Sequence, residues 1–332
     1  MRLLRRLLTG LAALVGAGAA VYFGACVLLY DEVASVPADC GGRYADNLPT
    51  RFGHAGWPET DFSPYQMPAY EDVSFPSLDP ELTIAGWYVP ADPADPDASA
   101  QAPTVVLVHG RGACKRDPAV LLPAGMLHRA GFSVLLIDLR DHGSSSVEDG
   151  RYAGGSDEHR DVVAAYRWLV AERGTPADRI GLVGTSLGAG TAALAVAAEP
   201  GFAAVWLDSG FADVLRAVED DLDNRGLPRL LAPGGLMLAP LVAGDNLMSS
   251  SPEKALERLD GRPVFITHGT ADTTIRVYHA DLLAAAAARG GSTVVPWIIP
   301  DAGHVDAMFI LPAEYEQRLV GFFRGSLEAG PG

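Results

Sequence analysis

Short apolar runs alternate with amphipathic stretches along most of the chain. Unbroken apolar runs such as 104–108 and 134–137 are typical of strands buried on both faces of a sheet. Between them, apolar residues recur three and four positions apart, which predicts helices. This alternation predicts βαβ units and a mostly parallel sheet with helices on both faces. The expected strands are Tyr70–Phe75, Leu82–Val89, Thr104–Val108, Val134–Ile137, Ile180–Val183, Ala203–Leu207, Pro263–Thr267 and Val294–Ile299, and the expected helices are Ala119–Ala130, Asp161–Arg173, Leu187–Ala198, Tyr278–Arg289 and Pro312–Leu327.

The amino-terminal segment has a different pattern. Leu7–Tyr30 is 24 residues long and carries no charge. A helix of that length spans roughly 36 Å, enough to cross a bilayer core of about 30 Å. Arg2, Arg5 and Arg6 precede it, so the positive-inside rule places the first residues in the cytoplasm. We expect an uncleaved signal anchor over residues 1–30, single-pass in the cell membrane, with the remaining chain on the extracytoplasmic side.

Two other interpretations of this segment compete with the anchor. A signal peptide cleaved after Val36-Pro37-Ala38 is one, but the apolar run is longer than the usual core of about 7–15 residues. A lipoprotein modified at Cys26 is the other, and the apolar residues that follow it fit that interpretation poorly.

A second interruption lies between two expected strands, over residues 209–262. An acidic, helix-like part there is followed by an apolar stretch, 230–244, rich in Gly and Pro. We expect a small cap or lid, and the apolar stretch either closes the core or contacts acyl groups or a membrane. The expected organisation is therefore an anchor (1–30), a linker rich in Pro, Gly and Asp (31–68), and one domain (69–330) that contains this cap.

Composition narrows the class of protein. The chain has 332 residues, 48% of them apolar, and a net charge of −16, which excludes wholesale disorder and disfavours a nucleic-acid binder. Residues 1–38 have a net charge of +1, so the remaining residues have a net charge of −17. Three cysteines exclude a disulfide framework, although pairing of Cys40 with Cys114 stays open. We expect no metal site and no cofactor.

The strongest chemical signal is the segment Gly-Thr-Ser-Leu-Gly at residues 184–188, between an expected strand and an expected helix. That context predicts a nucleophile elbow, in which a tight turn projects the hydroxyl of Ser186 above the sheet. His304 and Asp272 each follow an expected strand, so both should lie at the same carboxyl edge as Ser186. The pattern predicts a Ser186–His304–Asp272 triad, with Asp208 as the alternative acid.

A candidate oxyanion hole lies in the loop 109–112, His-Gly-Arg-Gly, which ends another expected strand. The backbone N–H groups of Arg111 and Leu187 are the expected donors. The Arg111 side chain is either incidental or holds an anionic group of the substrate.

From about residue 69 to 327 the chain resembles α/β-hydrolase-fold serine hydrolases, and more narrowly the membrane-anchored, serine-aminopeptidase-like bacterial group. The family usually has glycine where this chain has Asp141. The resemblance implies an α/β-hydrolase fold and the same triad but not the substrate. The matching segments are Gly86–Pro90, His109-Gly110, Lys115-Arg116, Asp138–Ser145, Gly184–Gly188, Ser251-Pro252, His268–Asp272 and Gly303-His304.

These observations predict a serine hydrolase that cleaves a carboxylic ester, a thioester or an amide through an acyl-enzyme. Its partner would be a small-molecule acyl substrate and not a nucleic acid. A serine exopeptidase of the same fold and a non-catalytic, membrane-tethered binding protein are the alternatives. The sequence leaves the substrate and the oligomeric state open.

Overall fold

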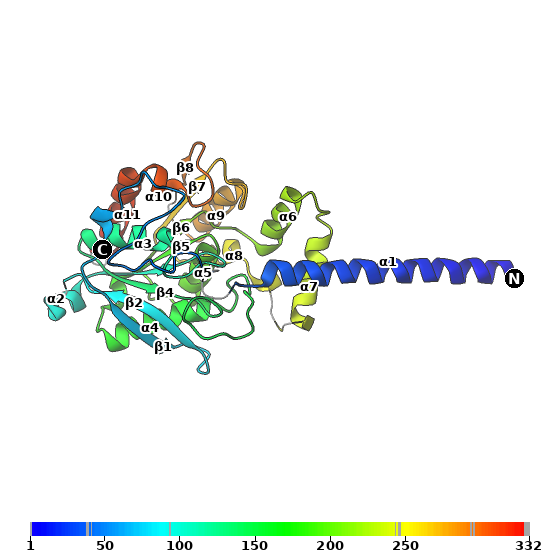
Figure 1. Cartoon of the computed structure of the whole chain (residues 1–332), viewed down its shortest axis with the longest axis horizontal. Helices are drawn as coiled ribbons and strands as arrows, with labels where there is room; N and C mark the ends of the chain where they lie inside the picture. Colours follow the sequence, from blue (N-terminus) through cyan, green and yellow to red (C-terminus); the bar gives the residue numbers. More distant parts are fainter. Residues whose placement is uncertain are drawn as a thin grey trace.

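One sheet forms the centre of the molecule (Figure 1). The computed structural model describes residues 2–37, 40, 42–92, 94–242, 244, 247–292, 294 and 296–328, and within them the sheet has eight strands in the order β1-β2-β4-β3-β5-β6-β7-β8. β1 and β2 form an antiparallel hairpin, β2 is antiparallel to β4, and all other neighbours are parallel. The predicted mostly parallel sheet is confirmed. The strands are β1 (Glu71–Pro76), β2 (Thr83–Val89), β3 (Thr104–Val108), β4 (Ser133–Ile137), β5 (Ile180–Thr185), β6 (Ala204–Asp208), β7 (Val264–Gly269) and β8 (Trp297–Ile299).

Helices cover both faces of the sheet because successive strand residues point to opposite sides. In β3, Val105 and Leu107 pack in one apolar cluster with α3, α10 and α11, whereas Val106 and Val108 pack in a second with α4, α5, α8 and α9. The helices of these two clusters are α3 (Pro118–Arg129), α4 (His159–Glu172), α5 (Leu187–Ala198), α8 (Pro252–Leu256), α9 (Tyr278–Arg289), α10 (Ala307–Ile310) and α11 (Pro312–Leu327). A short helix, α2 (Pro96–Gln101), precedes β3. The 3₁₀ turns are η2 (Ser63–Tyr65), η3 (Ala177–Arg179) and η4 (Leu247–Ser249).

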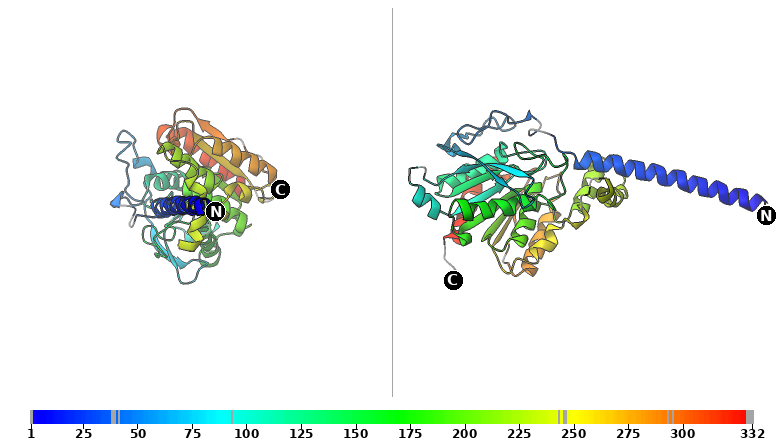
Figure 2. Two further views of the ribbon diagram at one scale, coloured as in Figure 1. Left: turned by 90° about the vertical axis from the view of Figure 1, so that its right-hand side faces the viewer. Right: turned by 90° about the horizontal axis from the view of Figure 1, so that it is seen from below.

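Helix α1 (Arg2–Ala34) projects from the globular part, and its amino terminus lies far from the sheet (Figures 1 and 2). Leu4–Ala34 is apolar and long enough to cross a membrane. Only 6% of its most apolar stretch of 18 residues is buried against the rest of the protein. The carboxyl-terminal turns of α1 pack instead against α6 (Val214–Asn224) and α7 (Leu231–Val242). These three helices form a third apolar cluster beyond the carboxyl edge of the sheet.

The structure differs from the sequence predictions at several boundaries. Helix α1 runs four residues beyond the expected anchor, and the expected linker 31–68 buries Phe52, Phe62 and Met67 against the core. Of the expected cap, α6 and α7 stand clear of the sheet, whereas α8 packs against α5 and α9. The last strand, β8, begins at Trp297 and lies at the edge of the sheet. An edge position is consistent with Pro296 just before it, since proline lacks the N–H group that a central strand would need. The cleavage site considered at Ala38 lies outside the described residues, as do residues 329–332 and, in the cap, 243, 245 and 246.

Candidate active site

Ser186 occupies a strained turn between β5 and α5. Its backbone has φ 55° and ψ −118°, a region that non-glycine residues rarely adopt. Glycines on either side make the turn sterically feasible. A Cβ on Gly184 would lie 2.1 Å from the carbonyl oxygen of Gly188, and one on Gly188 would lie 2.3 Å from that of Val108. The local sequence therefore forces the serine hydroxyl out of the sheet edge.

His304 lies between Ser186 and Asp272. Its Nε2 is 2.8 Å from Oγ of Ser186, and its Nδ1 is 2.7 Å from Oδ2 of Asp272. An ionised carboxylate only accepts hydrogen bonds, so Nδ1 carries the proton and donates it. Nε2 is then free to accept from the serine hydroxyl. The structure thus brings the three residues together in the order nucleophile, base and acid.

Three further contacts hold the Asp272 carboxylate. Oδ1 accepts from the backbone N–H groups of Thr274 and Ile275, both at 2.9 Å, and Nε2 of His268 lies 3.2 Å from Oδ2. Burial alone would raise the pKa of Asp272, but the hydrogen bonds from His268 and His304 outweigh it and lower the pKa well below its usual value. The carboxylate therefore stays ionised beside His304. The sequence suggested that His268 packs beneath this loop, but not that its ring would contact the carboxylate itself.

Asp208, the alternative acid, has other partners. It is fully buried at the end of β6 and accepts from the hydroxyls of Tyr315 and Ser209, each at 2.9 Å. Burial raises its pKa to about 6. No hydrogen bond joins Asp208 to His304 in the part of the chain that the structure describes. The geometry therefore favours Asp272 as the partner of His304.

The two expected oxyanion donors flank Ser186. Leu187 follows it, and Gly110 before Arg111 lies so close that a Cβ there would be 3.3 Å from Cβ of Ser186. Within the described ranges, neither the Arg111 nor the Leu187 backbone N–H donates to another protein group. Two unpaired N–H groups, one at the amino terminus of α5 and one in the loop after β3, are suited to a developing negative charge.

Several contacts fix the loop that carries Arg111. The buried Lys115 ammonium pairs with the Asp138 carboxylate, and the Lys115 backbone N–H donates to the same group at 2.7 Å. His142 Nε2 accepts from the Gly112 N–H at 3.3 Å. A disulfide joins Cys40 to Cys114, which resolves the pairing left open by the sequence. These contacts hold the loop against Asp138 and His142, which follow β4, and against Cys40.

Asp141, the departure from the family pattern, has φ 62°, a conformation that favours glycine. Its Oδ1 accepts three backbone N–H bonds, from Glu148, Asp149 and Gly150, at 2.8 to 3.1 Å. The side chain thus stabilises the loop in compensation for the strained backbone.

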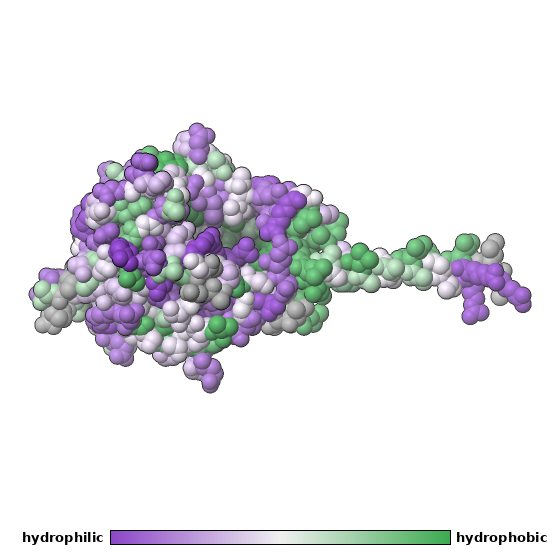
Figure 3. Space-filling model, viewed as in Figure 1, coloured by the Kyte–Doolittle hydropathy of each residue, from purple (hydrophilic) through white to green (hydrophobic). Residues whose placement is uncertain are grey.

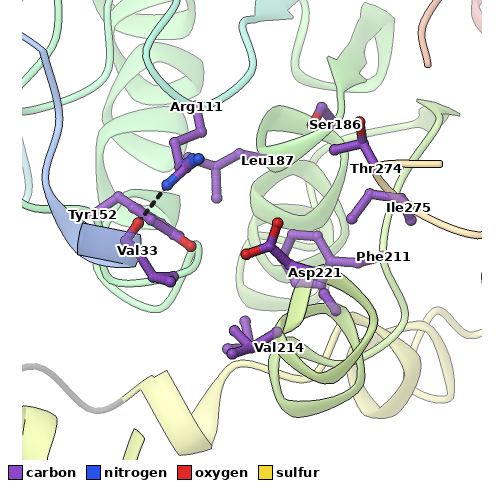
Figure 4. A pocket seen from close by; sticks show the side chains of 12 residues that line it. Val33, Arg111, Tyr152, Ser186, Leu187, Phe211, Val214, Asp221, Thr274 and Ile275 are labelled. Atoms are coloured by element: carbon purple, nitrogen blue, oxygen red, sulfur yellow. Dashed lines mark hydrogen bonds between the residues drawn. The ribbon is translucent and has the colours of Figure 1, made fainter. Parts of the chain in front are cut away.

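A pocket opens beside Ser186 (Figure 4). Its charged side chains both have protein partners: the Arg111 guanidinium donates to the Val33 carbonyl oxygen at 2.5 Å, and Asp221 pairs with Arg225 at 2.9 Å. The Arg111 side chain therefore anchors the end of α1, a role that the sequence did not indicate. The described residues that line the pocket are Val33, Arg111, Tyr152, Ser186, Leu187, Phe211, Val214, Ala217, Val218, Asp221, Thr274 and Ile275.

Solved structures share this fold. An esterase from Pyrococcus furiosus superposes with a TM-score of 0.64 at 21% identity, covering 85% of this chain and 98% of the esterase. An acylaminoacyl peptidase from Pyrococcus horikoshii superposes with a TM-score of 0.59 at 18% identity, covering 79% of this chain and 42% of the peptidase. At these identities the likeness establishes the α/β-hydrolase fold.

Sequence relatives extend the comparison. An uncharacterized 31.7 kDa protein of the traX-finO intergenic region in Escherichia coli is 31% identical over 120 residues, which is 36% of this chain and 41% of that protein. A second match of the same description is 33% identical over 97 residues, 29% of this chain and 32% of that protein. The chain thus spans well under half of the length of these relatives. Residues 122–328 match the model of the prolyl oligopeptidase family. This match covers more than half of the chain and its range includes Ser186, Asp272 and His304, so the chain belongs to the prolyl oligopeptidase family.

Proposed function

We propose that this chain is a membrane-anchored hydrolase that cleaves carboxylic esters with a Ser186–His304–Asp272 triad. The observation that carries the proposal is the hydrogen-bonded sequence from Ser186 through His304 to Asp272 at the wall of a largely apolar pocket.

The proposed reaction is a two-step acyl transfer. His304 Nε2 takes the proton of Ser186 as Oγ attacks the carbonyl carbon of the ester. The N–H groups of Arg111 and Leu187 stabilise the oxyanion, and Asp272 stabilises the imidazolium. The imidazolium then gives its proton to the departing alcohol, which leaves an acyl-enzyme on Ser186. Water, deprotonated by His304, hydrolyses that intermediate and returns the serine.

The pocket favours an ester over a peptide. An exopeptidase needs a charged group that is free to bind a peptide terminus. Asp221, the one carboxylate among the described lining residues, is already paired with Arg225, so it is not free to bind a peptide amino terminus. The other lining residues are mostly aliphatic or aromatic, which suits an acyl chain. The family also contains peptidases, so a serine exopeptidase is the second candidate.

Helix α1 supports an uncleaved anchor. Its last turns contribute Val33 to the pocket and bury Cys26, Tyr30 and Ala34 against the domain. Removal of the segment before Ala38 would expose this apolar surface and release Arg111. The three arginines at the other end favour a cytoplasmic amino terminus and an extracytoplasmic domain.

Turnover by the full chain in detergent tests the proposal. p-Nitrophenyl butyrate is compared with alanine p-nitroanilide, and Ser186→Ala supplies the background rate for each. We expect ester hydrolysis at least a hundredfold above background and no anilide hydrolysis above it. Anilide hydrolysis that depends on Ser186 at a comparable kcat/KM would favour the exopeptidase instead.

A further inference from the structure

Helix α7 crosses the carboxyl-terminal half of α1 in close contact. α7 runs transverse to α1 in Figure 1, and Figure 2 shows it beside α1 again. The Tyr22 hydroxyl donates to the Leu230 carbonyl oxygen at 2.8 Å. A Cβ on Gly234 would lie 2.5 Å from Sγ of Cys26, so the absence of a side chain there allows the close crossing.

The crossing lies at one boundary of the part of α1 that is exposed. Leu14 and Val21 are each 73% exposed, whereas Cys26 is fully buried. Residues 7–25 span roughly 28 Å at about 1.5 Å per residue, close to the thickness of a bilayer core of about 30 Å. If these residues span the membrane, α7 lies at the level of the headgroups, and its transverse direction places it in the membrane plane.

The outer side of α7 is apolar. Its sequence from Leu231 to Val242 contains no charged residue, yet Met237 is 68% exposed and Leu241 is 82% exposed. Leu230, just before the helix, is 60% exposed. We call Leu230, Met237 and Leu241 the α7 face. Figure 3 shows that the hydrophobic surface at this end of the globular part continues onto α1. The α7 face is therefore continuous with the surface that would contact lipid.

An apolar seam between α1, α6 and α7, called the passage below, extends from this region toward the pocket at Ser186, and the side chains of Val33 and Val218 lie between the two. A second, smaller cavity lies between α1, α6 and α7, and its lining includes Leu29, Ala232 and Leu236. Val33 and Val218 line both this cavity and the pocket at Ser186. One apolar cluster joins α7 to Leu187 beside the nucleophile.

We propose that the α7 face docks on the bilayer surface and that the passage between α1, α6 and α7 opens at Val33 and Val218 to take the acyl chain of an ester drawn from that bilayer. The inference rests on the proposed ester hydrolase and on α1 as a membrane anchor. The substrate class is an amphiphilic ester with a long acyl chain. Its chain would lie in the passage, and its carbonyl would reach Ser186 near the headgroup level.

The test uses the full chain reconstituted in phosphatidylcholine vesicles. Each sample is assayed with p-nitrophenyl palmitate carried in the vesicles and with water-soluble p-nitrophenyl acetate. The double variant Met237→Glu/Leu241→Glu places two charges on the α7 face. Val170→Glu is the matched control, because Val170 is a partly exposed apolar residue near the end of α4, at the opposite edge of the sheet. Gly235→Leu narrows the passage from α7, where a Cβ would make only ordinary contacts with α1.

We expect the palmitate-to-acetate rate ratio to fall at least tenfold in the α7 double variant and at least fivefold in Gly235→Leu. The ratio should change less than twofold in Val170→Glu. Hydrolysis of acetate with an unchanged ratio in both α7-side variants would overturn this inference and leave the ester hydrolase intact. Loss of a detergent-stable dimer in the double variant, with palmitate hydrolysis retained, would show that a second copy covers the α7 face and would also overturn it. Failure of the unmodified protein to hydrolyse either ester would overturn the proposed function itself.

Discussion

Nδ1 of His304 lies 2.7 Å from Oδ2 of Asp272, whereas Asp208 is bonded to the hydroxyls of Tyr315 and Ser209. Asp208 ends β6 and Asp272 lies in the loop after the neighbouring strand β7, so the two aspartates form a matched pair for mutation. Asp272→Asn should leave the imidazole with the wrong tautomer and reduce kcat by about 10⁴-fold. Asp208→Asn should reduce kcat far less. Steady-state kinetics on p-nitrophenyl butyrate measures both, and a larger loss in Asp208→Asn would reverse the assignment.

Gly188 should not accept a side chain. A Cβ there would lie 2.3 Å from the Val108 carbonyl oxygen, so Gly188→Ala must displace either the elbow or β3. We expect a loss of unfolding free energy of about 3 kcal/mol, as for severe overpacking, together with loss of activity. Gly325→Ala in α11 is the control, since nothing lies within 4 Å of its added Cβ. Thermal unfolding of both variants measures the difference, and equal melting temperatures would contradict the packing argument.

The disulfide between Cys40 and Cys114 should stabilise both the fold and the loop that carries Arg111. The two cysteines are 74 residues apart, and the chain-entropy model assigns about 4 kcal/mol to a loop of that length. Reduction of the wild-type protein and the double variant Cys40→Ser/Cys114→Ser should lower the melting temperature equally, and both should lower kcat. A reductant that destabilises the double variant as strongly as the wild type would show that the effect does not arise from this disulfide.

Glu158 should make the stability depend on pH. Its buried carboxylate accepts from the N–H groups of Ala153 and Gly155, and burial raises its pKa from 4.5 to about 7. A raised folded-state pKa means that the folded protein binds the proton more tightly. The contribution of Glu158 to the free energy of unfolding is therefore fully present below pH 4.5 and is lost as the pH rises to 7. The free energy of unfolding falls by roughly 3 kcal/mol over this range.

Glu158→Gln isolates this contribution. The variant should be less stable at low pH, because an amide cannot accept both N–H bonds, but the difference from the wild type should shrink as the pH rises from 5 to 8. Denaturant unfolding at several pH values gives this difference. A difference that is constant over that range would show that Glu158 does not titrate there.

The sequence was informative wherever local pattern determines structure. The bounds of α5, α9 and α11 agree with their expected ranges, because apolar spacing and glycine or proline at helix ends act over a few residues. Ser186, Asp272 and His304 could be proposed because each lies in the turn or loop that follows a strand. The contacts of Val33 with Arg111 and of Tyr22 with Leu230 could not, since they join residues 78 and 208 positions apart and no local pattern records them. The buried Phe52 and Phe62 were missed for the same reason.

The most direct test of the central claim is the site of labelling by a fluorophosphonate probe. The full chain is treated in detergent, digested, and mapped by mass spectrometry beside Ser186→Ala and His304→Ala. The triad predicts one phosphonylated residue, Ser186, with no labelling in Ser186→Ala and strongly slowed labelling in His304→Ala. Labelling of a different residue in the wild type, or labelling that persists in Ser186→Ala, would contradict the assignment of Ser186 as the nucleophile.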